Sequence, residues 1–225
     1  MSTSTTTTSP KRRGPGRPSA AVAGVPADRE VMLVGLATFA ELGFDATTVR
    51  ELARRLGVSH NFINDRFGNK ELFWRAVVDD GLGNDHHKGL TEVLGANHAT
   101  ELERLTAVIQ FVVRRANPQL HRLMSDEALR PTARLTYIVD RYLQPMILGL
   151  TPVMAALIRD GVIRPVPWSV LLFLMSAPSQ IHSTAPLVQI LGESLPENLD
   201  TSELFTSLIL NALRPTPSSL PSAAR

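Results

Sequence analysis

The chain has 225 residues, of which 44% are hydrophobic and 20% charged, with a formal net charge of +2 and no cysteine. This length accommodates one small and one medium domain, and the lack of cysteine excludes disulfides, thiolate metal sites and thiol nucleophiles. Because no segment offers about 18 consecutive apolar residues and the N-terminus lacks the apolar run of a signal peptide, we expect a soluble, cytoplasmic protein. The low aromatic content of 5% favours an all-helical fold.

Residues 1–27 are predicted to be a disordered basic arm, rich in Ser, Thr, Pro and Gly. The arm carries +4 without an acidic residue, which leaves −2 for the rest of the chain. Within it, Gly16-Arg17-Pro18 is similar to the core of an AT-hook, in which Arg17 would enter a narrow A·T-rich minor groove. The alternative is a tail that contacts phosphates without base preference. The four cations are Lys11, Arg12, Arg13 and Arg17.

Residues 28–42 are predicted to form the first helix, because apolar side chains recur there at helical spacing. Gly43 follows directly and is a plausible stop. The predicted buried stripe comprises Leu33, Leu36, Ala37 and Ala40.

Residues 47–67, TTVRELARRLGVSHNFINDRF, have the spacing of a helix-turn-helix. Thr48 is placed to cap the first helix, and Glu51 to reach back to the N–H of the cap, as in a capping box. Gly57 suits the left-handed position that ends this helix, and Ser59 is placed to cap the second helix. The second helix would then lie in a DNA major groove.

The side chains that face DNA follow from helix rotation. If Ile63 and Phe67 point into the core, Asn61 and Asp65 point most directly away. Asn pairs with adenine, a carboxylate accepts from cytosine N4, and a phenyl ring contacts the thymine methyl group. The flanking positions are Phe62 and Asn64.

Three residues nearer the helix ends, His60, Arg66 and Lys70, are predicted to contact phosphates. For Asp65 the alternatives are an ion pair with Arg66 or Lys70, or a negative charge that keeps the helix from binding DNA indiscriminately. The predicted DNA-binding residues are Arg17, Thr48, Ser59, His60, Asn61, Phe62, Asn64, Asp65, Arg66 and Lys70.

A further helix is predicted from Asn69, with Leu72, Phe73, Ala76 and Val77 on its apolar side. The run FAELGFDATTVRELARRLGVS, together with Phe67, Lys70, Glu71 and Leu72, resembles the tetracycline-repressor (TetR) family of bacterial transcription regulators over residues 28–78. Lys70 matches the phosphate-binding lysine of that family. Asn61, Phe62 and Asn64 depart from the usual small residue, Thr and Tyr, so no operator sequence follows from the resemblance.

Residues 79–213 are predicted to form a second, larger helical domain, followed by a disordered tail at 214–225. The fourth helix should end or bend within GLGNDHHKGL. Proline suits a first helical turn at Pro118 and Pro131, and should kink the long segment at Pro145 and Pro152. The predicted helical segments are 101–116, 118–129, 131–160, 168–181 and 199–213.

The resemblance implies that this second domain binds an effector and that its last two helices pair with those of a twin subunit. The final segment carries an apolar stripe, which we interpret as a dimer contact. The alternative is that the stripe closes the domain's own core. The stripe comprises Leu204, Phe205, Leu208, Ile209 and Leu213.

Polar and aromatic residues among apolar ones suggest a largely apolar ligand pocket whose methionines adapt to irregular shapes. The candidate ligand-binding residues are His121, Tyr137, Tyr142 and Trp168, with Gln144, Gln180, His182, Met124, Met146, Met154 and Met175 as further members. Asp85, His86 and His87 do not indicate a metal site, because adjacent histidines on a helix point about 100° apart. We predict no cofactor.

The sequence predicts a homodimeric, ligand-responsive repressor, with a palindromic DNA operator and a small hydrophobic effector as partners and no membrane contact. The alternative is an architectural DNA-binding protein without an effector, although the second domain would then have no role. An enzyme is disfavoured, because the chain has no GxSxG, HExxH or P-loop pattern.

Overall fold

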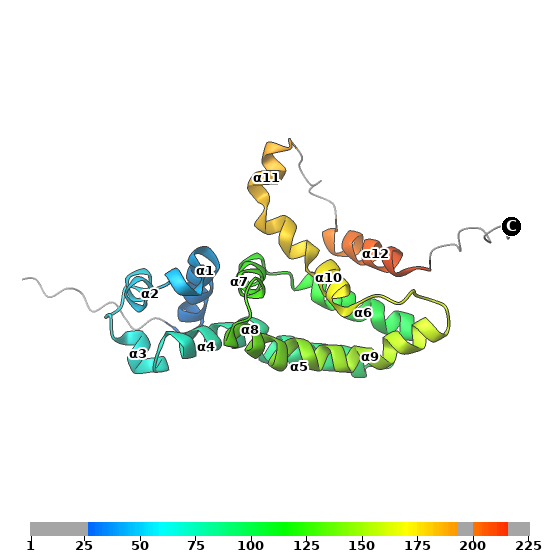
Figure 1. Ribbon diagram of the computed structural model, residues 1–225, viewed down its shortest axis with the longest axis horizontal. Coiled ribbons are helices and arrows are strands. Elements are labelled where there is room, and N and C mark those ends of the chain that lie inside the picture. The colour runs from blue at the N-terminus through cyan, green and yellow to red at the C-terminus, as the bar shows by residue number, and fades with distance from the viewer. Residues whose placement is uncertain (1–26, 193–199, 216–225) are drawn as a thin grey trace, which may run out of the picture.

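The computed structural model describes residues 27–192 and 200–215, apart from a few side chains within these ranges. Every regular element there is a helix, which confirms the all-α prediction. Figure 1 shows an elongated molecule with the first helices at one end and the later helices extending from them. The N-terminal helices are α1 (Asp28–Ala46), α2 (Val49–Leu56), α3 (Phe62–Phe67) and α4 (Lys70–Leu82).

The buried face of α1 is turned relative to the predicted stripe. Leu36 and Ala40 are buried as predicted, but Leu33 is 50% exposed. α1 packs against α4, where a Cβ atom on Gly35 would lie 2.7 Å from the Phe73 ring. It also packs against a helix of the second domain, so contacts with two neighbours decide which side is buried.

Gly43 interrupts α1 where the stop was predicted. Its φ of 73° lies in the left-handed region that favours glycine, yet one more turn follows and reaches Ala46. Thr47 closes this turn, because its N–H and its hydroxyl both donate to the Gly43 carbonyl. The predicted end of the first helix is therefore an interruption, and the helical segment extends four residues beyond Leu42.

The second domain contains nine further helical elements in the described residues. Four predicted segments match closely, while the segment beginning at Asn84 and a short helix after Thr184 were not predicted. The elements are α5 (Asn84–Gly95), α6 (Glu101–Arg114), α7 (Pro118–Ala128), α8 (Ala133–Ile138), the π-helical turn η1 (Val139–Leu143), α9 (Gln144–Arg159), α10 (Trp168–Ser183), α11 (Ala185–Ile190) and α12 (Thr201–Leu213).

The predicted segment 131–160 is a continuous helical run, Ala133–Arg159, with a π-turn in the middle. Proline at position 145 has no N–H and crowds the preceding turn, which explains a wider turn directly before it. Pro131 lies ahead of the helix and not in its first turn, because Thr132 is the N-cap and accepts from the Leu135 N–H at 3.0 Å. Pro118 does occupy the first turn of α7.

The run Ala133–Arg159 is the one helix in the described residues that is long and apolar enough to cross a membrane by length and composition. Its α9 part packs against α5 and α6 and buries Leu150, Val153 and Leu157 in the core of the second domain. One side of α9 thus faces the core, while 28% of the apolar window in this run is buried.

Two apolar clusters, which we call the first and second cores, organise the molecule. The first core is built mainly from α1 to α4 and is rich in aromatic side chains, and it also includes Leu120, Leu123 and Ile138 from α7 and α8. It therefore continues beyond residue 78, the predicted end of the DNA-binding domain. The second core joins α5, α6, α9, α10 and α12.

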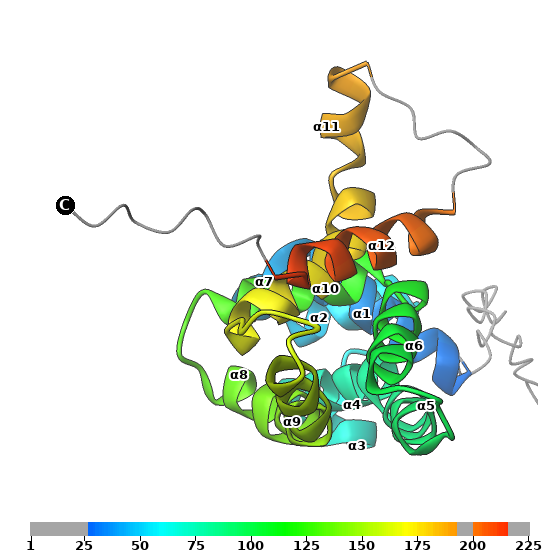
Figure 2. The ribbon, with the colours of Figure 1, turned by 90° about the vertical axis from the view of Figure 1, so that its right-hand side faces the viewer.

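The C-terminal stripe divides between the core and the surface. Ile209 and Leu213 are 3% and 1% exposed in the second core, whereas Leu208 is 51% exposed. Figures 1 and 2 show α11 projecting away from the rest of the molecule. Leu187 and Ile190 on this helix are exposed. The stripe thus closes the domain's own core and also leaves apolar surface uncovered.

Candidate DNA-binding surface and effector cavity

The first helix of the helix-turn-helix, α2, begins at the predicted cap. The Thr48 hydroxyl accepts from the Glu51 N–H at 3.1 Å. The predicted return contact is absent, because the Glu51 carboxylate pairs with Arg54 and Arg55, each at 2.7 Å. These two guanidinium groups lie one turn further along the helix and are stronger partners than a backbone N–H. They lower the pKa of Glu51 to about 2.

The turn between the two helices depends on Gly57. Its φ of 68° and ψ of 25° are left-handed, and nothing lies within 4 Å of a Cβ added there, so conformation and not space requires glycine. The Val58 N–H closes the turn on the Ala53 carbonyl at 3.0 Å. Ser59 does not cap α3 through its side chain as predicted; its carbonyl accepts the Phe62 N–H at 3.0 Å instead, and Asn61 is the N-cap residue.

The recognition helix α3 is oriented as the rotation predicts. Ile63 is fully buried and Phe67 packs against the first core. Asn61, Asn64 and Asp65 are exposed, on the side away from that core. The surface that the sequence assigns to base contacts is therefore open to solvent.

The remaining predicted contact residues surround this surface. His60 and Thr48 are exposed, while Phe62 is half-buried against the first core, with the Arg66 guanidinium 5.7 Å from its ring. Arg17 lies outside the described residues.

Neither cation proposed as a partner of Asp65 pairs with it. Arg66 forms an ion pair with Asp28 at the start of α1. The Lys70 ammonium donates to the Phe44 and Thr47 carbonyls, both at 2.8 Å, and burial lowers the pKa of Lys70. Lys70 thus fixes the end of α1 and keeps one N–H donor for another acceptor.

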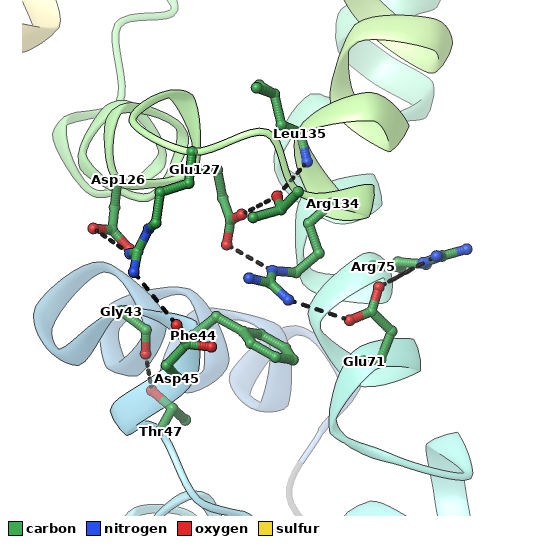
Figure 3. A network of polar contacts seen from close by, with 12 residues as sticks. Gly43, Phe44, Asp45, Thr47, Glu71, Arg75, Asp126, Glu127, Arg134 and Leu135 are labelled. Atoms are coloured by element: carbon green, nitrogen blue, oxygen red, sulfur yellow. Dashed lines mark hydrogen bonds and ion pairs between the residues drawn. The ribbon is translucent and has the colours of Figure 1, made fainter.

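A polar network joins the two domains (Figure 3). Arg134 Nε, on α8, donates to Glu127 Oε1 of α7 at 2.7 Å, and its guanidinium lies 3.6 Å from the Glu71 carboxylate at the start of α4. The same guanidinium stacks 3.7 Å above the Phe44 ring near the end of α1. Thr132 donates to the other Glu127 oxygen at 2.8 Å. The second domain is therefore tied to the helices on both sides of the helix-turn-helix.

Tyr137 and Tyr142, predicted as ligand-binding residues, also lie at this junction. Both hydroxyls donate to the Asp79 carboxylate on α4, the Tyr137 bond being 2.6 Å long. Burial, and then the bond to Asp79, raises the pKa of Tyr137 to about 12 and raises that of Tyr142 as well. They connect the η1 region to α4.

A largely apolar cavity of about 360 Å³ lies mainly between α7, α8 and α10, and single residues of α4, α5, α6, η1 and α9 complete its wall. This volume is at the lower end of the range for small-molecule pockets. Of the predicted ligand-binding set, His121, Met124, Met146 and Met175 line it. Burial lowers the pKa of His121. Trp168 packs against the second core and does not line the cavity, and Tyr137 and Tyr142 lie outside its wall.

Three side chains belong both to the cavity wall and to the first core: Leu82, Leu120 and Ile138. A molecule in the cavity would therefore contact side chains that pack against the DNA-binding helices. The sequence did not identify these residues, because the residues around an apolar position do not show that it will contact both a cavity and a core.

Sequence reasoning also did not select Arg115, His86 and Asn117 at the cavity wall. The one signal for Arg115 was its position in an Arg-Arg pair at the end of a predicted helix. The structure shows no cluster of three His, Asp or Glu side chains suited to a metal ion in the part of the chain that it describes.

A helix-turn-helix joined to a larger helical domain with a cavity is the architecture of a DNA-binding regulator. The sequence model described as "Bacterial regulatory proteins, tetR family" matches residues 32–77. The HTH-type transcriptional dual regulator CecR of Shigella flexneri is 27% identical over 161 residues, which cover 62% of this chain and 68% of that protein. Over residues 32–77 the chain is thus similar to the tetR family of bacterial regulatory proteins, as the resemblance in sequence implied.

Solved structures share the fold over most of the chain. A putative fatty acid metabolism regulator of Clostridium perfringens aligns with a TM-score of 0.63 and 18% identity, covering 83% of this chain and 99% of that one. The ketosteroid transcriptional regulator KstR2 of Mycobacterium tuberculosis aligns with a TM-score of 0.58 and 21% identity, covering 87% of this chain and 100% of that one. AibR, in complex with isovaleryl coenzyme A and operator DNA, aligns with a TM-score of 0.59 and 18% identity, covering 82% of this chain and 96% of that one.

Proposed function

We propose that the protein is a cytoplasmic, homodimeric repressor that leaves a palindromic operator when a small hydrophobic effector occupies the apolar cavity. The observation that carries this proposal is the shared wall: Leu82, Leu120 and Ile138 line the cavity and pack in the first core. An effector that fits better when these side chains are displaced also favours a displaced DNA-binding domain. Its effect is limited to its difference in affinity for the two arrangements.

The polar junction gives this coupling a second route. Glu127 stands on the cavity-lining helix α7, and Arg134 links it to Glu71 at the start of α4. A shift of α7 would therefore change the position of α4, which directly follows the recognition helix. The related structure of AibR with isovaleryl coenzyme A and operator DNA supports a regulator with both kinds of ligand.

For DNA contacts we propose the division made from the sequence. The exposed Asn61, Asn64 and Asp65 would read base edges, with Phe62 at the margin, since they lie on the outward side of α3. His60, Arg66 and Lys70 would contact phosphates, with Thr48 and Ser59 at the helix starts. Arg17 in the basic arm would enter the adjacent minor groove.

For the dimer we propose the surface formed by α11 and the exposed side of α12. Leu187 and Ile190 are 54% and 83% exposed, and Leu208 is 51% exposed. Exposed apolar side chains that gather on terminal helices are typical of protein interfaces. A dimer would also space two recognition helices for two operator half-sites.

The alternative is an architectural DNA-binding protein. An enzyme is a weaker alternative, because the cavity wall is apolar and has few titratable groups. Footprinting separates the first two: a repressor protects one discrete palindrome, and an architectural protein protects DNA broadly.

The direct test measures operator binding by fluorescence anisotropy while a library of apolar metabolites is screened by thermal shift. Compounds that stabilise the protein should weaken operator binding without dissociating the dimer, which light scattering reports. Leu172→Trp, which fills the cavity from α10 on the side of the second core, should abolish the thermal shift and keep operator binding. Stabilising compounds that leave operator affinity unchanged would refute the proposal.

A further inference from the structure

The apolar cavity adjoins a second, more polar hollow of about 650 Å³. The two share four wall residues: His86, Arg115, Ala116 and Asn117. A molecule that fills the apolar cavity would therefore have its outer end beside Arg115. The polar hollow is the open side, since Gln119 and Asp80 on its rim are exposed to solvent.

Arg115 is held in place by packing at the end of α6. Its guanidinium lies 4.1 Å from the centre of the Phe111 ring, and the His86 ring meets Phe111 edge-on at 5.3 Å. Gly89 of α5 makes room for this stack, because a Cβ there would lie 2.6 Å from the Phe111 ring and 3.8 Å from Arg115 Nη2. A guanidinium placed over an aromatic ring is positioned by that contact, and its N–H donors can still bind a planar anion.

The described charges around Arg115 also favour the binding of an anion. Within the side chains that the structure describes, no carboxylate lies within ion-pair distance of the Arg115 guanidinium. Asp80 lines the outer, polar hollow and not the apolar cavity, whereas Arg115 lines both. A guanidinium at the edge of an apolar cavity suits a bidentate carboxylate, which gains the most from Arg geometry.

We propose, building on the effector-release function above, that the effector is an amphipathic carboxylic acid. Its carboxylate binds Arg115 at the junction of the two hollows, and its hydrocarbon chain lies in the cavity against Met146 and Met175. The polar end selects acids over neutral compounds, and the apolar wall selects by chain length.

Isothermal titration calorimetry tests this with octanoate, decanoate, decanoyl coenzyme A and 1-decanol, each below its solubility limit or the concentration at which it forms micelles. Decanoate should bind the wild-type protein about fourfold more tightly for each methylene that it has beyond octanoate. Arg115→Gln should weaken decanoate at least about tenfold and leave 1-decanol unchanged. Arg114→Gln is the matched control: it removes the same charge one residue away, on a side chain that donates to Ser202 and not into the cavity.

Three results would overturn the inference: 1-decanol binding as tightly as decanoate, equal losses of both ligands in Arg115→Gln, or binding of decanoyl coenzyme A without binding of decanoate. Operator anisotropy run in parallel separates this inference from the proposed function. Decanoate that binds through Arg115 but leaves operator affinity unchanged would refute effector release and support the carboxylate site. If 1-decanol and decanoate bind with equal affinity and both release the operator, the carboxylate site would be refuted and effector release would be supported.

Discussion

Arg134 and Glu127 form the ion pair that is most withdrawn from solvent at the junction of the two domains. Their side chains are 15% and 4% exposed, and Arg134 Nε lies 2.7 Å from Glu127 Oε1. The pair is completed by the Thr132 hydroxyl, the Glu71 carboxylate and the Phe44 ring, as Figure 3 shows for the surrounding network. It therefore stabilises the position in which α7 and α8 meet α1 and α4.

Arg134→Met should destabilise the protein by about 3–5 kcal/mol, because it leaves the buried Glu127 carboxylate without its charged partner. Urea unfolding measures this loss. Arg130→Met is the control: its pairs with Asp45 and Asp126 are 3.5 Å long on a side chain 56% exposed, so its loss should stay within about 1 kcal/mol. Equal losses in the two variants would show that the Arg134 pair has no special role.

The two tyrosines of the chain, Tyr137 and Tyr142, should ionise later in the folded protein than in the unfolded one. Burial and the bond to Asp79 raise the pKa of Tyr137 from 10.0 to about 12, and that of Tyr142 also rises. Since the folded state binds these protons more tightly, their contribution to stability is present below pH 10 and is lost as the pH rises from 10 to about 12.

Tyrosinate absorbance measures this directly, because no other tyrosine contributes to the signal. The titration in urea should have its midpoint near pH 10, and the native titration should be displaced upward. Asp79→Asn should bring the native midpoint down only in part, because burial is the larger cause. A native midpoint at the urea value would contradict the contacts with Asp79.

Asn61→Ala and Asn64→Ala should each weaken operator binding by about 1–3 kcal/mol and relax discrimination at particular base pairs. Both side chains are exposed on α3, so folding stability should change little. Anisotropy with operator and with random DNA measures both affinities. A residue whose loss weakens both DNAs equally would be a phosphate contact.

Deletion of residues 1–27 should make the dependence of log affinity on log salt shallower. The arm contributes four cations per subunit, and each phosphate contact carries a slope of about −0.9, so a dimer loses at most about 7 units. Arg17→Ala should reduce affinity more for operators with A·T-rich flanks, which have a narrow minor groove. An unchanged slope after deletion would show that the arm does not bind DNA.

The sequence by itself determined the local features of the DNA-binding domain. The Thr48 cap, the left-handed Gly57 and the inward Ile63 were all readable, because each depends on hydrogen bonds or helix rotation within a few residues. The same local rules failed at two positions: the Glu51 carboxylate pairs with two nearby guanidinium groups, and Asn61 takes the N-cap position predicted for Ser59.

Only the tertiary structure decided which distant side chains meet. Tyr137 and Tyr142 carry the features of ligand contacts in the sequence, yet their hydroxyls donate to Asp79, some 60 residues earlier. Leu120 and Ile138 are ordinary apolar residues in the sequence and become the shared wall of cavity and first core. Helical periodicity tells which residues share a face, but the packing of one helix against two neighbours decides what that face contacts.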